Sequence, residues 1–133
     1  MTGEEVAAGG RTRILLIEDE PSVAAFLLTA LQRRGYEVTA SRSGAEGLEM
    51  LAREEYQGVI SDFRTPGGVT GADVRDWLNR HRPELAMRMI FITGDMASQE
   101  TAEFLEHSDT PCVEKPFRVQ LLMAAVEKTI GKP

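Results

Sequence analysis

The chain has 133 residues, 42% of them apolar, and a formal net charge of −6, which are values of one ordinary globular domain. Its 21 acidic and 15 basic residues argue against direct nucleic-acid binding, which needs a basic surface. The single cysteine, Cys112, excludes an internal disulfide and a four-cysteine zinc site and favours a reducing cytoplasm. No run approaches the roughly 20 apolar residues of a membrane span, so no membrane association is expected.

The chain is expected to consist of a short flexible segment followed by one folded domain. Residues 1–11 contain the pair Gly9-Gly10 and no apolar stretch, and are interpreted as a flexible lead-in or linker and not as a signal peptide. Residues 12–133 alternate short apolar runs with longer amphipathic segments and are predicted to form one domain.

Five apolar runs are predicted to be buried strands, because each is too short and too continuously apolar for a surface helix. Pro21 in a first turn, Ser43 as a cap and Pro83 as a stop signal help to bound the helices between them. The expected strands are 14–17, 36–40, 58–61, 89–92 and 112–113. The expected helices start at Pro21 and stop before Gly35, follow Ser43, carry Val74 to His81 and stop before Pro83, and run roughly over 97–106 and over 117–130.

This alternation predicts an α/β fold with a doubly wound, five-stranded parallel sheet and helices on both faces. Right-handed crossovers and five strand–helix units fit the flavodoxin-like strand order 2-1-3-4-5. In such sheets ligands bind beyond the carboxyl ends of the strands, where the strand order reverses. Here that point lies between the first and third strands.

Polar residues follow four of the predicted strands. They are Glu18 and Asp19 after the first, Asp62 after the third, Thr93 after the fourth and Lys115 after the fifth. Each alone has an ordinary explanation, as a first-turn acid, a turn residue, a cap or a solvated side chain. Together they favour a site, because capping does not require acids after both central strands and a lysine after the last.

Three carboxylates at one edge of a sheet favour a bound divalent cation, because they repel one another by roughly 4 kcal/mol per pair at about 4 Å and an effective dielectric constant of about 20. Oxygen ligands indicate Mg²⁺, with Mn²⁺ as an alternative, and they are too few to cage Ca²⁺. A hard cation with open positions, a carboxylate and a lysine are the parts that phosphoryl transfer to a carboxylate needs.

In their order and spacing these residues resemble the receiver domains of bacterial response regulators, the CheY-like superfamily, over about residues 13–130. The acidic pair Glu18-Asp19 matches one that helps to bind Mg²⁺ in that family. Asp62 matches the phosphoacceptor, and Pro66 matches the proline four residues after it. The resemblance also implies a metal ligand from the backbone carbonyl of Arg64.

The second half of the chain carries the rest of the resemblance. Thr93 matches the residue that hydrogen-bonds the phosphoryl group, and Lys115-Pro116-Phe117 matches the motif after the fifth strand. The resemblance implies a cis peptide bond before Pro116, a bond found chiefly before proline. It also places Arg64 and Asp95 across the site's mouth, where a salt bridge between them is expected to tune the dephosphorylation rate.

The chain departs from the family pattern at three positions. Thr65 stands where methionine is common, and Gly71 comes one residue late, which indicates a lengthened loop around Gly67-Gly68. Cys112 occupies the position of a switch aromatic that moves with the threonine in the family. A cysteine is too small for that role, so the usual relay to the neighbouring face is in doubt while the phosphorylation chemistry is not.

The expected function is that of a phosphoryl-accepting switch in two-component signalling, phosphorylated on Asp62 by a sensor histidine kinase or a histidine phosphotransfer domain. It would catalyse its own phosphorylation and slow dephosphorylation without being a turnover enzyme. The Gly-Gly loop and the Ile-Thr-Gly end of the fourth strand suggest a receiver from a hybrid histidine kinase. The downstream protein target is not evident.

Most other functions fit the sequence less well. A haloacid-dehalogenase-like phosphatase has a second aspartate where this chain has Arg64, and neither a Walker loop nor G-x-G-x-x-G is present for a nucleotide. A redox sensor is disfavoured because no neighbour in the sequence lowers the pKa of Cys112. An interaction module of this fold that signals without phosphate stays open because of Cys112.

Overall fold

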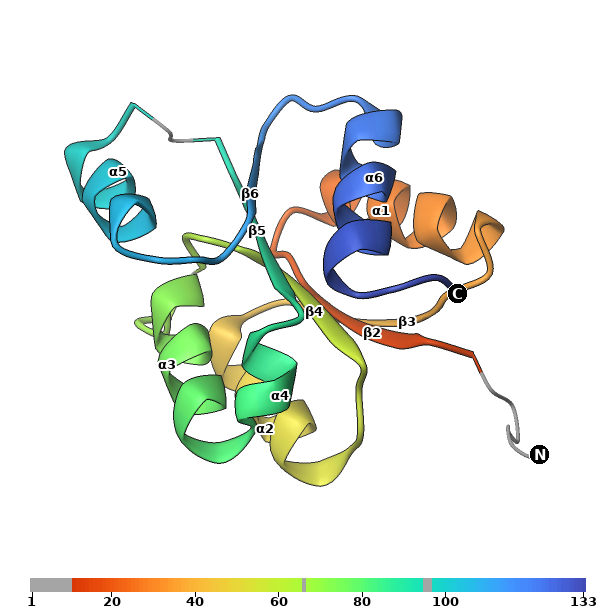
Figure 1. Ribbon diagram of the computed structural model, residues 1–133, viewed down its shortest axis with the longest axis horizontal. Coiled ribbons are helices and arrows are strands. Elements are labelled where there is room, and N and C mark those ends of the chain that lie inside the picture. The colour runs from red at the N-terminus through yellow and green to blue at the C-terminus, as the bar shows by residue number, and fades with distance from the viewer. Residues whose placement is uncertain (1–10, 66, 95–96) are drawn as a thin grey trace.

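A single parallel sheet forms the centre of the molecule (Figure 1). The computed structural model describes residues 11–65, 67–94 and 97–133. The strand order is β3-β2-β4-β5-β6, which in chain order is 2-1-3-4-5, so the predicted flavodoxin-like fold is confirmed. The strands are β2 (Arg13–Ile17), β3 (Glu37–Ser41), β4 (Gly58–Asp62), β5 (Met89–Thr93) and β6 (Cys112–Glu114).

Helices cover both faces of this sheet (Figure 1). One face carries α1 (Pro21–Arg33) and α6 (Val119–Thr129). The other face carries α2 (Gly44–Arg53), α3 (Gly71–His81), α4 (Pro83–Ala86) and α5 (Gln99–Glu106). None of the described helices combines the length and the apolar composition needed to cross a membrane.

The continuous apolar run of β2 is explained by its position between the two helical layers. Ile14 and Leu16 join the apolar cluster under α1 and α6, whereas Leu15 and Ile17 join the cluster under α2 and α3. All four side chains are fully buried. A central strand of a parallel sheet is covered on both faces, so it lacks the polar alternation of an exposed strand.

The start of α3 lies directly against the end of β4. The backbone N–H of Gly71 donates to the carbonyl of Phe63 at 2.9 Å. A Cβ atom on Gly71 would lie 2.7 Å from the carbonyl oxygen of Asp62, so only glycine fits there. A capping box between Thr70 and Asp73 satisfies the first N–H groups of the helix.

Several predicted boundaries shift by one or two residues, and one helix was missed. The strand expected at 36–40 is Glu37–Ser41, and the last helix begins at Val119 rather than at Phe117. The helix Pro83–Ala86 was not predicted, because Pro83 was interpreted only as a stop signal. Proline is also favoured in the first turn of a helix, and here it starts the next one.

Candidate functional site

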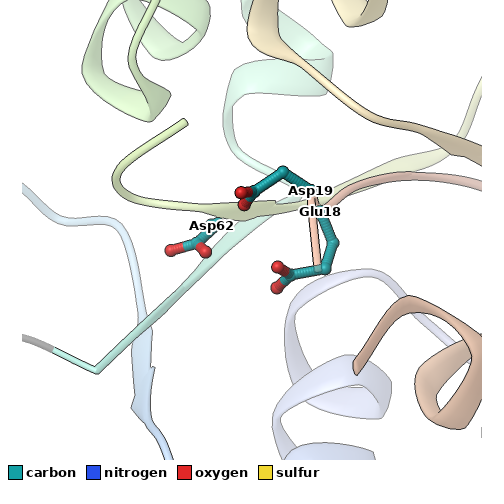
Figure 2. Close-up of side chains that lie close together, drawn as sticks. All are labelled: Glu18, Asp19 and Asp62. Atoms are coloured by element: carbon teal, nitrogen blue, oxygen red, sulfur yellow. The ribbon is translucent and has the colours of Figure 1, made fainter. Parts of the chain in front are cut away.

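Three carboxylates meet at the carboxyl ends of β2 and β4 (Figure 2). Glu18, Asp19 and Asp62 each place one ligand oxygen within 4.8 Å of those of the other two. The two strands are paired in parallel with Ile17 opposite Ser61, so the residues that end or follow them lie side by side. Glu18 is 2% exposed and Asp62 is 8% exposed, which is unusual burial for acids, whereas Asp19 is exposed.

Lys115 contacts two members of this acidic group and one further acid, Glu20. Its Nζ is 3.0 Å from Oε1 of Glu18, 3.1 Å from Oδ2 of Asp62 and 3.5 Å from Oε1 of Glu20. Glu20 was not among the predicted site residues, although its place directly after the acidic pair was a usable signal. The backbone of Lys115 is fixed by a 2.7 Å hydrogen bond from its N–H to the carbonyl of Thr93.

The ionisation of these groups shows that the pocket is short of positive charge. Burial raises the pKa of Asp62 and of Glu18 above their ordinary values, and contacts with Lys115 only partly offset the effect. Burial lowers the pKa of Lys115, but its close contacts with the carboxylates of Glu18 and Asp62 outweigh that, so the lysine stays charged. One ammonium group therefore does not neutralise the acids around it.

The donor set fits a hard divalent cation. Oε1 of Glu18 is buried and, among the described residues, accepts no hydrogen bond of good geometry, so its contact with Lys115 is an ion pair. The other oxygen, Oε2, accepts from the backbone N–H of Glu20 at 3.1 Å. Carboxylate oxygens without nitrogen or sulfur are the ligands that Mg²⁺ takes, and here they come from Glu18, Asp19 and Asp62.

The remaining predicted site residues lie near this edge. Thr93 is buried at the end of β5, the strand next to β4. The Lys115–Pro116 peptide bond is cis, as the resemblance implied. Pro66 and Asp95 lie outside the described residues, so their expected roles stay predictions.

Arg64 projects from the loop that follows β4. Its backbone N–H donates to Oδ1 of Asp62 over 3.4 Å. Its guanidinium donates to the Oγ of Ser98 at 3.1 Å and forms an ion pair of 2.9 Å with Glu100. No sequence signal pointed to Glu100, which is 36 residues away.

Cys112 lies half-buried at the start of β6 and packs against the apolar cluster under α3. Burial raises the pKa of its thiol to about 11, and the charges of Glu114 and Asp62 act in the same direction. The thiolate is the reactive form of cysteine. The structure therefore gives no support to a redox role at this position.

Comparison with known proteins decides the family. Residues 14–127 match the family described as the response regulator receiver domain. The chain belongs to this family. The response regulator receiver protein CpdR of Brucella abortus is 30% identical over 118 residues, which cover 89% of this chain and 96% of CpdR. Other curated relatives are longer, and the chain spans about half of their length.

Solved structures of receiver domains agree with this assignment. The response regulator TrrA of Thermotoga maritima, solved with Mg²⁺ and BeF, has a TM-score of 0.76 and 27% identity, with 89% of this chain and 98% of TrrA covered. The receiver domain of a sensor histidine kinase from Pseudomonas aeruginosa was solved with magnesium in its active-site cleft and has a TM-score of 0.80 at 22% identity. The match covers 92% of this chain and 100% of that receiver domain. The latter likeness shows the fold alone.

These findings establish the predicted family and its role in two-component signalling, in which receiver domains act with histidine kinases as phosphoacceptor switches rather than as classical enzymes. The acidic group of Glu18, Asp19 and Asp62 is consistent with a phosphorylation site. Attachment to a hybrid histidine kinase stays a prediction, because only one of the structures described here comes from a sensor kinase.

Proposed function

We propose that this receiver domain accepts a phosphoryl group on Asp62 from a phosphohistidine of a sensor kinase or a histidine phosphotransfer domain. The observation that carries the proposal is the position of Asp62, whose carboxylate lies beside those of Glu18 and Asp19 and 3.1 Å from the ammonium group of Lys115. A carboxylate oxygen of Asp62 forms the new bond to phosphorus, and the bond between phosphorus and the imidazole nitrogen breaks with its electrons on the nitrogen.

The residues of this chain have separate tasks in the proposed transfer. Glu18, Asp19, Asp62 and the backbone carbonyl of Arg64 would hold Mg²⁺, or Mn²⁺ in its place, which when bound supplies positive charge to the transferring group. Lys115 already contacts Oδ2 of Asp62 and would stabilise the charge on the phosphoryl oxygens. Thr93, buried at the end of the next strand, would hold the phosphorylated product together with Lys115.

Incubation with acetyl phosphate and Mg²⁺ tests the proposal directly. We expect the intact mass to increase by one phosphoryl group in the wild-type protein and not in Asp62→Asn, because the carboxylate nucleophile is then absent. Asp76→Asn is the matched control, since Asp76 lies on the exposed side of α3 in an ion pair with Arg80, and it should be modified like the wild type. Equal modification of Asp62→Asn and wild type would refute the assignment, and full modification in EDTA would refute the metal requirement.

The stability of the metal-free protein tests the electrostatics of the same site. Because the pKa of Asp62 is raised in the folded state, its carboxyl favours folding while protonated, and this contribution is lost as the pH rises through the raised pKa. Lys115 keeps Glu18 and Glu20 as partners when Asp62 is replaced, so no unpaired buried cation is left. At neutral pH in EDTA, Asp62→Asn should therefore be more stable than the wild type by on the order of 1 kcal/mol, the free energy of about one pKa unit. The two proteins should converge below the ordinary carboxyl pKa.

Addition of Mg²⁺ should reverse this difference. A ligand at a hundredfold excess over its Kd adds roughly 2.7 kcal/mol to the free energy of unfolding, and Asp62→Asn should gain much less because it lacks one ligand. Urea unfolding across the pH range, with and without Mg²⁺, measures both effects. Equal stabilisation of the two proteins by Mg²⁺ would contradict the metal site.

A further inference from the structure

The guanidinium of Arg64 holds the first turn of α5. A single nitrogen, Nη2, donates both to the Oγ of Ser98 and to Oε1 of Glu100. Ser98 is the N-cap residue of α5, and Glu100 lies in its first turn. The loop that follows Asp62 is thereby connected through the side chain of Arg64 to a helix that begins 35 residues after Arg64.

The ion pair between Arg64 and Glu100 is weak enough for Arg64 to leave it for another partner. The side chains of Arg64 and Glu100 are 50% and 77% exposed, and exposed ion pairs contribute little to stability. A cation at the N-terminus of a helix also faces the positive end of the helix dipole. The cap bond of Ser98 is long, at 3.5 Å from the backbone N–H of Thr101, so the side-chain cap adds little to the 3.0 Å backbone bond from Ala102 to Ser98.

The site beside Arg64 would need a further cation after phosphorylation. Three acids contact Lys115, namely Glu18, Glu20 and Asp62, and Asp19 lies beside two of them. A phosphoryl group on Asp62 adds negative charge and three strong acceptor oxygens. Arginine binds phosphate oxygens through two parallel N–H groups, and Arg64 is only two residues from Asp62.

We infer that Arg64 exchanges partners when Asp62 is phosphorylated: its guanidinium leaves Ser98 and Glu100, binds the phosphoryl group, and thereby loosens the first turn of α5. The inference rests on the proposed function and adds Glu100 to it as a positioning residue that holds Arg64 in the resting state. It gives α5 a way to respond to phosphorylation that does not need an aromatic side chain at Cys112. It also makes Arg64 a ligand of the phosphoryl group, which should slow its hydrolysis.

The rest of α5 is built to allow such a response. Thr101 is its one fully buried residue, and its hydroxyl accepts or donates no hydrogen bond among the described residues. The helix is held mainly by Phe104, whose ring packs against Phe63 and Phe91 with centroids 5.2 and 5.7 Å apart. The ring contacts lie beyond the first turn and keep the helix docked, whereas the exposed residues Gln99 and Glu100 at its start can move without breaking them.

Amide hydrogen exchange of the whole protein tests the exchange of partners. On phosphorylation by acetyl phosphate and Mg²⁺, residues 99–103 of the wild type should exchange roughly two- to fivefold faster, the range expected for loss of one exposed ion pair. In Glu100→Gln and in Arg64→Ala, these residues should already exchange faster before phosphorylation and change little on it. Arg64→Ala should also shorten the lifetime of the phosphoryl group by roughly the same factor, and Arg64→Lys should restore part of it.

Arg80→Ala is the matched control, because it breaks an exposed arginine–aspartate pair on α3 and should alter neither readout. Intact mass in the same samples separates a failure of the proposed function from a failure of the inference about Arg64. A wild-type protein that gains no phosphoryl group overturns both the proposed function and the inference. A phosphorylated wild type with unchanged exchange at residues 99–103, or an Arg64→Ala variant with an unchanged phosphoryl lifetime, overturns the inference alone.

Discussion

The helices α3 and α5 both pack on the apolar cluster beside Asp62, but they are anchored differently. Val74 and Leu78 of α3 are fully buried, and a capping box closes its N-terminus. On α5 the apolar residues Phe104 and Leu105 are only partly buried, and its cap relies on the long bond to Ser98. The difference indicates that α3 fixes the position of Asp62, whereas α5 is the neighbour able to change.

Equivalent leucine substitutions should show the largest difference between the two helices. Leu78→Ala removes a fully buried side chain and should lower the free energy of unfolding by about 2–5 kcal/mol. Leu105→Ala removes a side chain that is only partly buried and should cost about 1 kcal/mol or less. Urea unfolding at constant pH measures both values, and similar losses would remove the distinction between the helices.

The helix caps should show the same contrast on a smaller scale. Thr70→Ala breaks the capping box of α3, in which the backbone N–H of Asp73 donates to the hydroxyl at 3.1 Å, and should cost about 1 kcal/mol. Ser98→Ala breaks the 3.5 Å cap bond and the exposed 3.1 Å contact with Arg64 and should cost about 0.5 kcal/mol, the low end for a helix cap. A larger loss for Ser98→Ala would mean that α5 is held at its first turn more firmly than the geometry indicates.

The fold was predictable because its strands and helices carry strong local patterns. Fully buried runs such as 14–17 and 89–92 leave little choice but central strands of a parallel sheet. The failures occurred where one residue type serves two roles, as Pro83 does when it ends one helix and begins another. Shifts at the helix ends arise because tertiary contacts, rather than propensity, decide the last turn.

The geometry of the site was predictable where strand ends bring residues together. Glu18, Asp62 and Lys115 lie in contact because parallel strands place their carboxyl ends at one edge. The pairing of Arg64 with Glu100 was not predictable, because it depends on where a loop and a helix terminus meet in space. Sequence spacing carries no information about such a contact between surface side chains.

The tight fit of Gly71 against Asp62 has a practical consequence for engineering this domain. The chain on either side of the intervening loop is fixed, by the strand at one end and by the hydrogen bond from Gly71 to Phe63 at the other. At Gly67 and Gly68, in contrast, an added Cβ atom would meet nothing within 4 Å. A foreign peptide grafted between those two glycines would be displayed on the segment that joins Asp62 to α3 while the scaffold on either side keeps its shape, which makes this loop a natural position for a reporter of phosphorylation.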